Sequence, residues 1–257
     1  MHSRIPIALT LAANIFTYAM ACATDPGVVD SGNVDWACAQ FKYDRMLYFE
    51  STCRTCHLRK PARSKHCSVC GRCVQMMDHH CIWLNNCVGL NNARWFLGFL
   101  ASFSMVCVYG VYILGSAVLE LRHRTGLADL MVPDEASGKM VKLLLAVLTV
   151  FVVLLAPIIT LFTAYQLRIV MLGYTTNEEA KWLNVAAAID DGVLFAVCGE
   201  DGGEMLEVVE KEDQEADSRE KSPVVSLSDV VNAYDRGLWQ NLRFLVFPPT
   251  HQRAKLG

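Results

Sequence analysis

The stretch His66-Cys67-Ser68-Val69-Cys70-Gly71-Arg72-Cys73, continued to Cys87 by VQMMDHHCIWLNNC and preceded by Cys53-Arg54-Thr55-Cys56, decides how this chain folds. Seven cysteines and four histidines lie between Cys53 and Cys87. They include three Cys-x2-Cys pairs, and this is the spacing at which two thiolates bind one tetrahedral zinc ion. Residues 53–94 are too polar and too few to bury a core, so we expect metal binding to supply their folding energy.

The number of ligands leaves one cysteine over. Two closed zinc sites need eight ligands, and six cysteines with two histidines provide them. Spacing alone does not identify the remaining thiol, but local chemistry favours Cys81, because Asp78, His79 and His80 directly precede it. A thiol beside an imidazole that a carboxylate orients is typical of a catalytic nucleophile. The alternative is a wholly structural zinc module.

The zinc sites themselves are not expected to activate the thiol. In a Cys3His site three thiolates outweigh the two positive charges of Zn²⁺, and two such sites would repel a further thiolate. We therefore expect His79 to take the proton of Cys81 and zinc to act as a scaffold.

Three long apolar stretches predict an all-α polytopic membrane protein with three transmembrane helices. Residues 5–23, 95–119 and 143–167 contain no charged side chain. Each is long enough to cross a hydrocarbon core of about 30 Å. We predict transmembrane helices at 4–24, 95–119 and 143–168. The alternative is three buried core helices. The formal net charge of −3 indicates no particular partner, and nothing suggests nucleic-acid binding.

The first apolar stretch could also be a secretory signal peptide with a cleavage site at Ala21-Cys22-Ala23. That would export the cysteines to an oxidising compartment, where thiols form disulfides rather than metal sites. We therefore expect a retained helix and a cytosolic segment at 25–94, with the zinc-stabilised cysteine-rich domain at about 51–98. The excess of Lys and Arg in this segment over the segment 120–142 agrees with a lumenal position for the latter.

The region after the third apolar stretch, residues 169–257, is expected in the cytosol. Residues 200–221 hold ten acidic side chains against Lys211, Arg219 and Lys221, which predicts a disordered acidic insert at 199–225. Aromatic and aliphatic residues between Leu227 and Pro248 indicate an amphipathic helix against the membrane face.

The segment from Cys53 to Phe96 closely resembles the cysteine-rich domain of the DHHC-type protein S-acyltransferases, or palmitoyltransferases. The match includes Asp78-His79-His80-Cys81, Cys87, Asn92 and Phe96. Three further family motifs follow the family's order. They are Asp25-Pro26-Gly27, Thr175-Thr176-Asn177-Glu178, and the segment from Asn232-Ala233-Tyr234 to Asn241.

The resemblance implies roles for individual residues. One zinc site would be formed by Cys53, Cys56, His66 and Cys73, and the other by Cys67, Cys70, His80 and Cys87. His79 would be the base, Asp78 its orienting partner, and Cys81 the thiol that takes an acyl group from palmitoyl-CoA and passes it to a substrate cysteine. Candidate contacts to the CoA phosphates, as a group, are Arg59, Lys60, Arg63, Lys65, Arg72 and Arg94.

The resemblance also implies partners and a location. The cofactors would be two structural Zn²⁺ ions, with palmitoyl-CoA as co-substrate. The partners would be the lipid bilayer and membrane-associated proteins with juxtamembrane cysteines. The residues Trp83 to Cys87 and the Thr-Thr-Asn-Glu motif are similar to those of a fungal endoplasmic-reticulum branch, with the Golgi as the alternative. The family norm is four transmembrane helices, so a catalytically inactive zinc-stabilised adaptor is the alternative function.

Overall fold

The computed structural model describes residues 4–129, 136–198, 204–208, 221–224, 226 and 230–250. The chain divides into two compact units. The first combines residues Met1–Ala21 with Trp95–Leu167, and the second combines Cys22–Arg94 with Arg168–Gly257. The two apolar segments of the first unit are thus far apart in sequence, and so are the two polar segments of the second.

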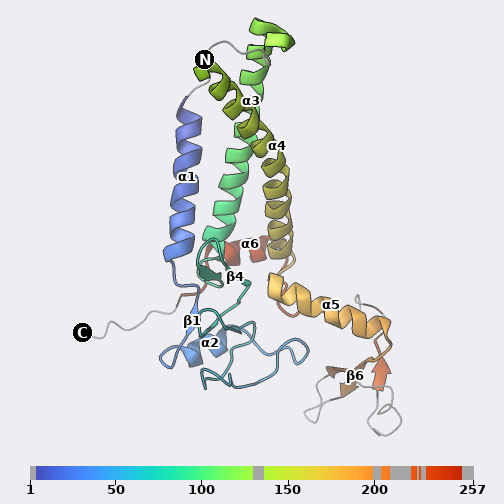
Figure 1. Ribbon diagram of the computed structural model, residues 1–257. Helices are drawn as coiled ribbons and strands as arrows, with labels where there is room; N and C mark the ends of the chain where they lie inside the picture. Colours follow the sequence, from blue (N-terminus) through green and yellow to red (C-terminus); the bar gives the residue numbers. More distant parts are fainter. Residues whose placement is uncertain are drawn as a thin grey trace, which may run out of the picture. The chain divides into compact units, whose positions relative to one another are not determined.

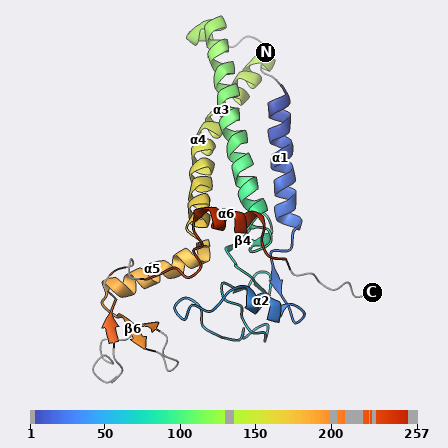
Figure 2. The ribbon, with the colours of Figure 1, turned by 180° about the vertical axis from the view of Figure 1, so that it is seen from behind.

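The first unit is helical. Its helices are α1 (Arg4–Ala23), α3 (Ala93–Asp129) and α4 (Ala136–Met171), which lie side by side in Figures 1 and 2. Asn14 of α1 donates to Ser102 of α3 at 3.2 Å, and the hydroxyls of Ser104 and Thr160 are 2.8 Å apart between α3 and α4. Polar and small side chains at these contacts are typical of helices packed in lipid, because the hydrophobic effect does not drive helices together there.

Two helical segments, Ala93–Glu120 and Leu143–Met171, are long and apolar enough to cross a membrane. Helix α1 has a shorter apolar segment, Ile7–Ala23. In the most apolar windows of the two long segments only 17% and 6% of residues are buried, whereas a core helix of a soluble protein is mostly buried. The alternative of buried core helices therefore disagrees with the structure.

The helix ends differ from the predicted boundaries. Helix α3 continues ten residues past Leu119 to Asp129, and α4 begins at Ala136, so most of the expected segment 120–142 is helical. An uncharged stretch indicates only the part of a helix that could lie in hydrocarbon. The helix can continue past that part through polar residues. Pro157 lies inside α4 without ending it. Residues 130–135 lie outside the described residues.

The second unit contains short strands that an all-α prediction misses. β1 (Val28–Val29), β2 (Lys65–Cys67) and β3 (Arg72–Val74) form an antiparallel sheet in the order β1-β3-β2. β4 (His79–Cys81) pairs with β5 (Asn86–Val88). Strands of three residues are too short to show a periodic sequence pattern, which explains why they were not predicted.

The described residues of the second unit also contain three helices. α2 (Val34–Gln40) follows β1, and α5 (Thr176–Asp190) follows α4. α6 (Leu238–Val246) lies within the range in which an amphipathic helix was expected. A buried cluster joins distant parts of the chain. It contains Phe41, Tyr48, Ala62, Leu90 and Tyr234.

The expectation of an acidic disordered insert is wrong where the structure describes it. β6 (Leu194–Cys198) pairs antiparallel with β7 (Glu204–Val208) and β8 (Lys221–Pro223). Residues 204–208 contain three apolar residues and only two glutamates, so the high overall charge of the segment concealed a short strand. Residues 199–203, 209–220 and 225 lie outside the described residues.

Candidate active site and metal centres

Two groups of ligand atoms have the geometry of metal sites. Cys53, Cys56, His66 and Cys73 place one donor atom each within 4.8 Å of one another, and so do Cys67, Cys70, His80 and Cys87. These are the two sets that the family resemblance implies. Neighbouring residues His66 and Cys67 belong to different groups, so the two sites interleave along the chain.

The distances fit one tetrahedral ion in each group. With Zn–S bonds of about 2.3 Å and Zn–N bonds of about 2.0 Å, sulfur and nitrogen should be about 3.6 Å apart and two sulfurs about 3.8 Å apart. The Nδ1 atom of His66 lies 3.3–3.9 Å from the three sulfurs of its group. That of His80 lies 3.3–3.7 Å from the sulfurs of the second group. The Cys70 and Cys87 sulfurs, 3.5 Å apart, are too distant for a disulfide of about 2 Å.

Each group is closed by a hairpin. His66 pairs directly with Cys73 between β2 and β3, and His80 pairs with Cys87 between β4 and β5. Residues opposite each other on antiparallel strands lie close together, so each hairpin brings its histidine to its last cysteine. The Cys-x2-Cys turns provide the other two sulfurs. In both turns the first sulfur accepts the backbone N–H of the second cysteine at 3.4 Å.

Strand β4 separates the two adjacent histidines. Successive side chains of a strand point to opposite faces, so His80 faces its metal group while His79 and Cys81 share the other face. Nδ1 of His79 lies 2.6 Å from Oδ2 of Asp78, and the imidazole is also hydrogen-bonded to the Cys81 thiol. Asp78, His79 and Cys81 therefore form a hydrogen-bonded series in which the imidazole lies between the carboxylate and the thiol.

The thiol and the imidazole alter each other's protonation. Burial lowers the pKa of His79, but hydrogen bonds with Asp78 and Cys81 outweigh it and raise that pKa from 6.5 to about 9. Burial raises the pKa of Cys81, but the hydrogen bond from His79, backbone hydrogen bonds from Leu84 and Trp83 and the charge of His79 together lower that pKa below 9.0. Both shifts favour a thiolate beside an imidazolium.

Asp78 is held by a residue far away in sequence. The backbone N–H of Thr176 donates to Oδ1 of Asp78 at 2.6 Å, and the Thr176 hydroxyl donates to Oδ2 at 2.9 Å. Thr176 is the first residue of α5, so the carboxylate sits at the positive end of this helix. Local sequence contains no signal for this contact.

A capping box fixes the start of α5. The Thr175 hydroxyl accepts the backbone N–H of Glu178, and the Glu178 carboxylate accepts the backbone N–H of Thr175. The Thr-x-x-Glu pattern alone could have predicted this cap. Glu178 is also buried against Arg63, whose Nε donates to Oε1 at 2.6 Å, and Tyr48 donates to the same oxygen at 3.1 Å.

The six candidate CoA contacts have different surroundings in the structure. Arg63 is only 3% exposed and lies over the rings of Phe41 and Tyr234, so its position disagrees with a phosphate contact. The exposed Arg59 pairs with Asp35 at 2.9 Å. Lys65 and Arg72 are exposed on β2 and β3, Lys60 is half-buried, and Arg94 donates to the Val246 carbonyl at 2.9 Å.

The Asp25-Pro26-Gly27 motif packs against the backbone at Gln75 and Gly89. The backbone N–H of Gln75 donates to the Gly27 carbonyl at 2.9 Å. At Gly89 a Cβ atom would lie 2.6 Å from the Pro26 carbonyl, so only glycine allows this approach. The motif therefore fixes the backbone that leads into Asp78.

Comparison with known proteins agrees with this site. The family model described as "DHHC palmitoyltransferase" matches residues 47–183. The chain belongs to the DHHC palmitoyltransferase family. Its match extends from Leu47 to Leu183 and so includes both metal groups, Cys81 and the Thr175–Glu178 cap.

Several curated palmitoyltransferases are similar to this DHHC family member over most of its length. Palmitoyltransferase swf1 of Schizosaccharomyces pombe is 35% identical over 90% of this chain and 63% of its own. Palmitoyltransferase SWF1 of Yarrowia lipolytica is 30% identical over 95% and 70%, and palmitoyltransferase ZDHHC4 of Rattus norvegicus is 34% identical over 95% and 68%. The chain thus spans about two thirds of the length of these relatives.

Proposed function

We propose that this chain is a protein-cysteine S-palmitoyltransferase that acts through Cys81. The observation that carries the proposal is the contact series Thr176, Asp78, His79, Cys81, with a thiol that neither metal group uses. The names of its relatives point to the same activity.

In the first step the Cys81 thiolate attacks the carbonyl carbon of acyl-CoA. The bond between that carbon and the CoA sulfur breaks, and His79 returns the proton of Cys81 to the leaving CoA thiolate. In the second step a substrate thiol gives its proton to His79 and attacks the acyl-enzyme, and Cys81 leaves and is reprotonated. Asp78 keeps the imidazole oriented in both steps, because Thr176 holds its two oxygens.

The two metal groups fit zinc by donor set and distance, since three thiolates and one imidazole are typical structural zinc ligands. The bound metal would supply a fixed scaffold and folding energy. We propose Cys53, Cys56, His66 and Cys73 for one ion, and Cys67, Cys70, His80 and Cys87 for the other.

The membrane placement extends the same proposal. α1 is the third membrane-crossing helix beside α3 and α4, the cysteine-rich segment faces the cytosol, and the endoplasmic reticulum is the location, in line with the resemblance of residues Trp83 to Cys87 to a fungal endoplasmic-reticulum branch. The exposed side chains of Ile82 and Trp83 directly follow Cys81, so the thiol would meet the acyl chain at an apolar edge. A 16-carbon chain gains roughly 12 kcal/mol by staying out of water, at about 0.8 kcal/mol per CH₂.

Exposed Lys65 and Arg72 and half-buried Lys60 are the proposed contacts to the CoA phosphates.

Incubation of the purified chain with labelled palmitoyl-CoA tests the proposal. We expect one hydroxylamine-sensitive label, absent in Cys81→Ser and retained in Cys107→Ser. His79→Ala should also abolish labelling while both metals stay bound. A well-folded, metal-loaded chain that takes up no label would support an inactive adaptor instead. Loss of a metal ion in His79→Ala would contradict the assigned division between the two histidines.

A further inference from the structure

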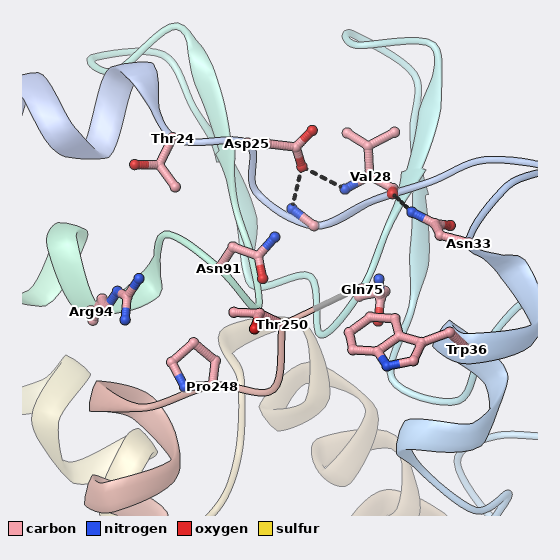
Figure 3. Close-up of a pocket in the computed structure, with 11 residues that line it drawn as sticks. Thr24, Asp25, Val28, Asn33, Trp36, Gln75, Asn91, Arg94, Pro248 and Thr250 are labelled. Atoms are coloured by element: carbon pink, nitrogen blue, oxygen red, sulfur yellow. Dashed lines mark hydrogen bonds between the residues drawn. The ribbon is translucent and has the colours of Figure 1, made fainter. Parts of the chain in front are cut away.

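A pocket separate from Cys81 lies beside the Asp25-Pro26-Gly27 motif. Its volume is about 400 Å³, and its lining includes Thr24, Asp25, Trp36, Gln75 and Arg94. Figure 3 shows Gln75 and Trp36 on one side of this pocket and Arg94 and Pro248 on the other. Neither His79 nor Cys81 lines it, and the metal ligands do not either, so the proposed acyl transfer gives this pocket no role.

Gln75 brings an unused acceptor to the pocket wall. Its side chain is 97% buried, since only 3% of the residue is exposed, and its Oε1 atom has no hydrogen-bond partner among the described residues. The backbone of Gln75 is fixed, because its N–H donates to Gly27 and its carbonyl accepts from Leu90. Leaving a buried acceptor without a donor costs folding free energy. The terminal amide of Gln75 can rotate readily about χ3, so its oxygen can turn toward a ligand.

The charges of the pocket form a pair of opposite sign. Arg94 brings a permanent positive charge, and the exposed Asp25 brings a carboxylate whose Oδ1 already accepts the N–H groups of Gly27 and Val28. An anionic ligand would meet Asp25, and a cationic one would meet Arg94. Arg94 already donates to the Val246 carbonyl, but its charge still favours a phosphate, while an N–H donor on the same ligand would suit Gln75 and Asp25.

Primary and quaternary amines differ at this pocket. A primary ammonium has N–H bonds to donate to Gln75, whereas a trimethylammonium has none. Quaternary amines are usually recognised by cages of several aromatic rings, and Trp36 is the only aromatic residue among the described residues of the lining. The pocket therefore favours ethanolamine over choline as the amine.

The chain position of the lining residues indicates where such a ligand comes from. Thr24 directly follows α1, and Arg94 is the second residue of α3. Residues at the ends of membrane-crossing helices lie at the depth of the lipid headgroups. This step relies on the membrane placement proposed above. We propose that the pocket binds the headgroup of phosphatidylethanolamine, with its phosphate at Arg94 and its ammonium at Gln75 and Asp25.

Native mass spectrometry of the full chain, extracted from vesicles of equal amounts of phosphatidylethanolamine and phosphatidylcholine, tests this. We expect one retained lipid, with phosphatidylethanolamine favoured about tenfold, as one hydrogen bond to a charged group implies. Gln75→Met should remove the preference, and Gln75→Glu should increase it by adding a carboxylate. The matched control Gln40→Met, outside the lining, should leave it unchanged.

Equal retention of the two lipids, or no retained lipid, would overturn the proposal. So would displacement of the lipid by free CoA, because the pocket would then be part of the CoA site. If Gln75→Met fails to fold, which a metal content below that of the unaltered chain would reveal, the Gln75→Glu variant decides. Self-labelling at Cys81 is measured in parallel: its absence with the lipid preference intact contradicts the acyltransferase and leaves this site standing.

Discussion

At the scale of single residues, the alternation of β4 assigns different tasks to two neighbouring histidines. His80 lies with three sulfurs, and His79 lies between Asp78 and Cys81. The choice of Cys81 could be made from sequence, because a carboxylate and imidazoles stand directly before it. The partition of the metal ligands could not be derived from spacing, since several pairings satisfy it; it came from the family resemblance. The Thr176 contact was beyond prediction, because its partner lies 98 residues away.

Thr176→Val tests whether that contact supports acyl transfer. The substitution removes the hydroxyl that donates to Asp78 but keeps the backbone donor and the side-chain shape. We expect acylation of Cys81 to slow by roughly tenfold, the lower end for a hydrogen bond to a charged group. Single-turnover labelling with palmitoyl-CoA measures the rate.

The control is Thr149→Val, because that hydroxyl donates only within its own helix, to Leu145. Two metal ions per chain should remain in both variants. An unchanged acylation rate in Thr176→Val would show that the backbone donor alone suffices to hold Asp78.

At the scale of elements, α5 is anchored by a buried ion pair. Glu178 caps this helix and pairs with Arg63, whose side chain lies in an aromatic cluster. The Thr-x-x-Glu pattern is a signal for the capping box, whereas nothing in the sequence indicates that Arg63 is buried, because a basic residue in a polar loop is usually solvated. Burial depends on which distant rings surround a residue, and no local pattern reports that.

Glu178→Leu should destabilise the chain by about 3–5 kcal/mol, because the buried Arg63 loses its counter-charge. The double variant Arg63→Met/Glu178→Leu should recover a large part of that loss, since two apolar side chains replace the pair. The variants are compared by thermal unfolding in detergent, with metal release as the readout.

Arg168→Met serves as the control, because it breaks a partly exposed pair with Glu179 at 3.5 Å and should cost at most about 1 kcal/mol. A double variant no more stable than the single one would contradict the explanation by an unpaired charge.

At the scale of the whole molecule, the apolar stretches predicted the helices of one unit, and the cysteine spacing predicted the metal groups of the other. Hydropathy reports composition alone, so it located α3 and α4 but not their polar ends at Asp129 and Ala136. Composition also misled at the acidic insert, where short strands lie within a highly charged segment.

Leu154→Arg tests whether α4 lies in lipid. Leu154 is 63% exposed near the middle of the apolar segment, so its surroundings are either hydrocarbon or water. In hydrocarbon a central arginine costs about 2.5–3.5 kcal/mol of insertion free energy, whereas in water an exposed arginine costs little. We expect a clear loss of inserted protein, measured as the fraction that resists alkaline carbonate extraction.

Leu183→Arg is the matched control, because Leu183 is 68% exposed on α5, outside the apolar segments. It should leave the extracted fraction unchanged. Equal behaviour of the two variants would argue that α4 does not cross a membrane.

The distance between Asp78 and Thr176 along the chain also sets an order of events during synthesis. When the ribosome has released both cysteine hairpins, Asp78 still lacks the two donors that Thr176 provides. At about 5–20 residues per second, the intervening 98 residues need roughly 5–20 s. Both long apolar helices are translated in that interval. The two hydrogen bonds that hold Asp78 therefore form only after both long apolar helices have been made.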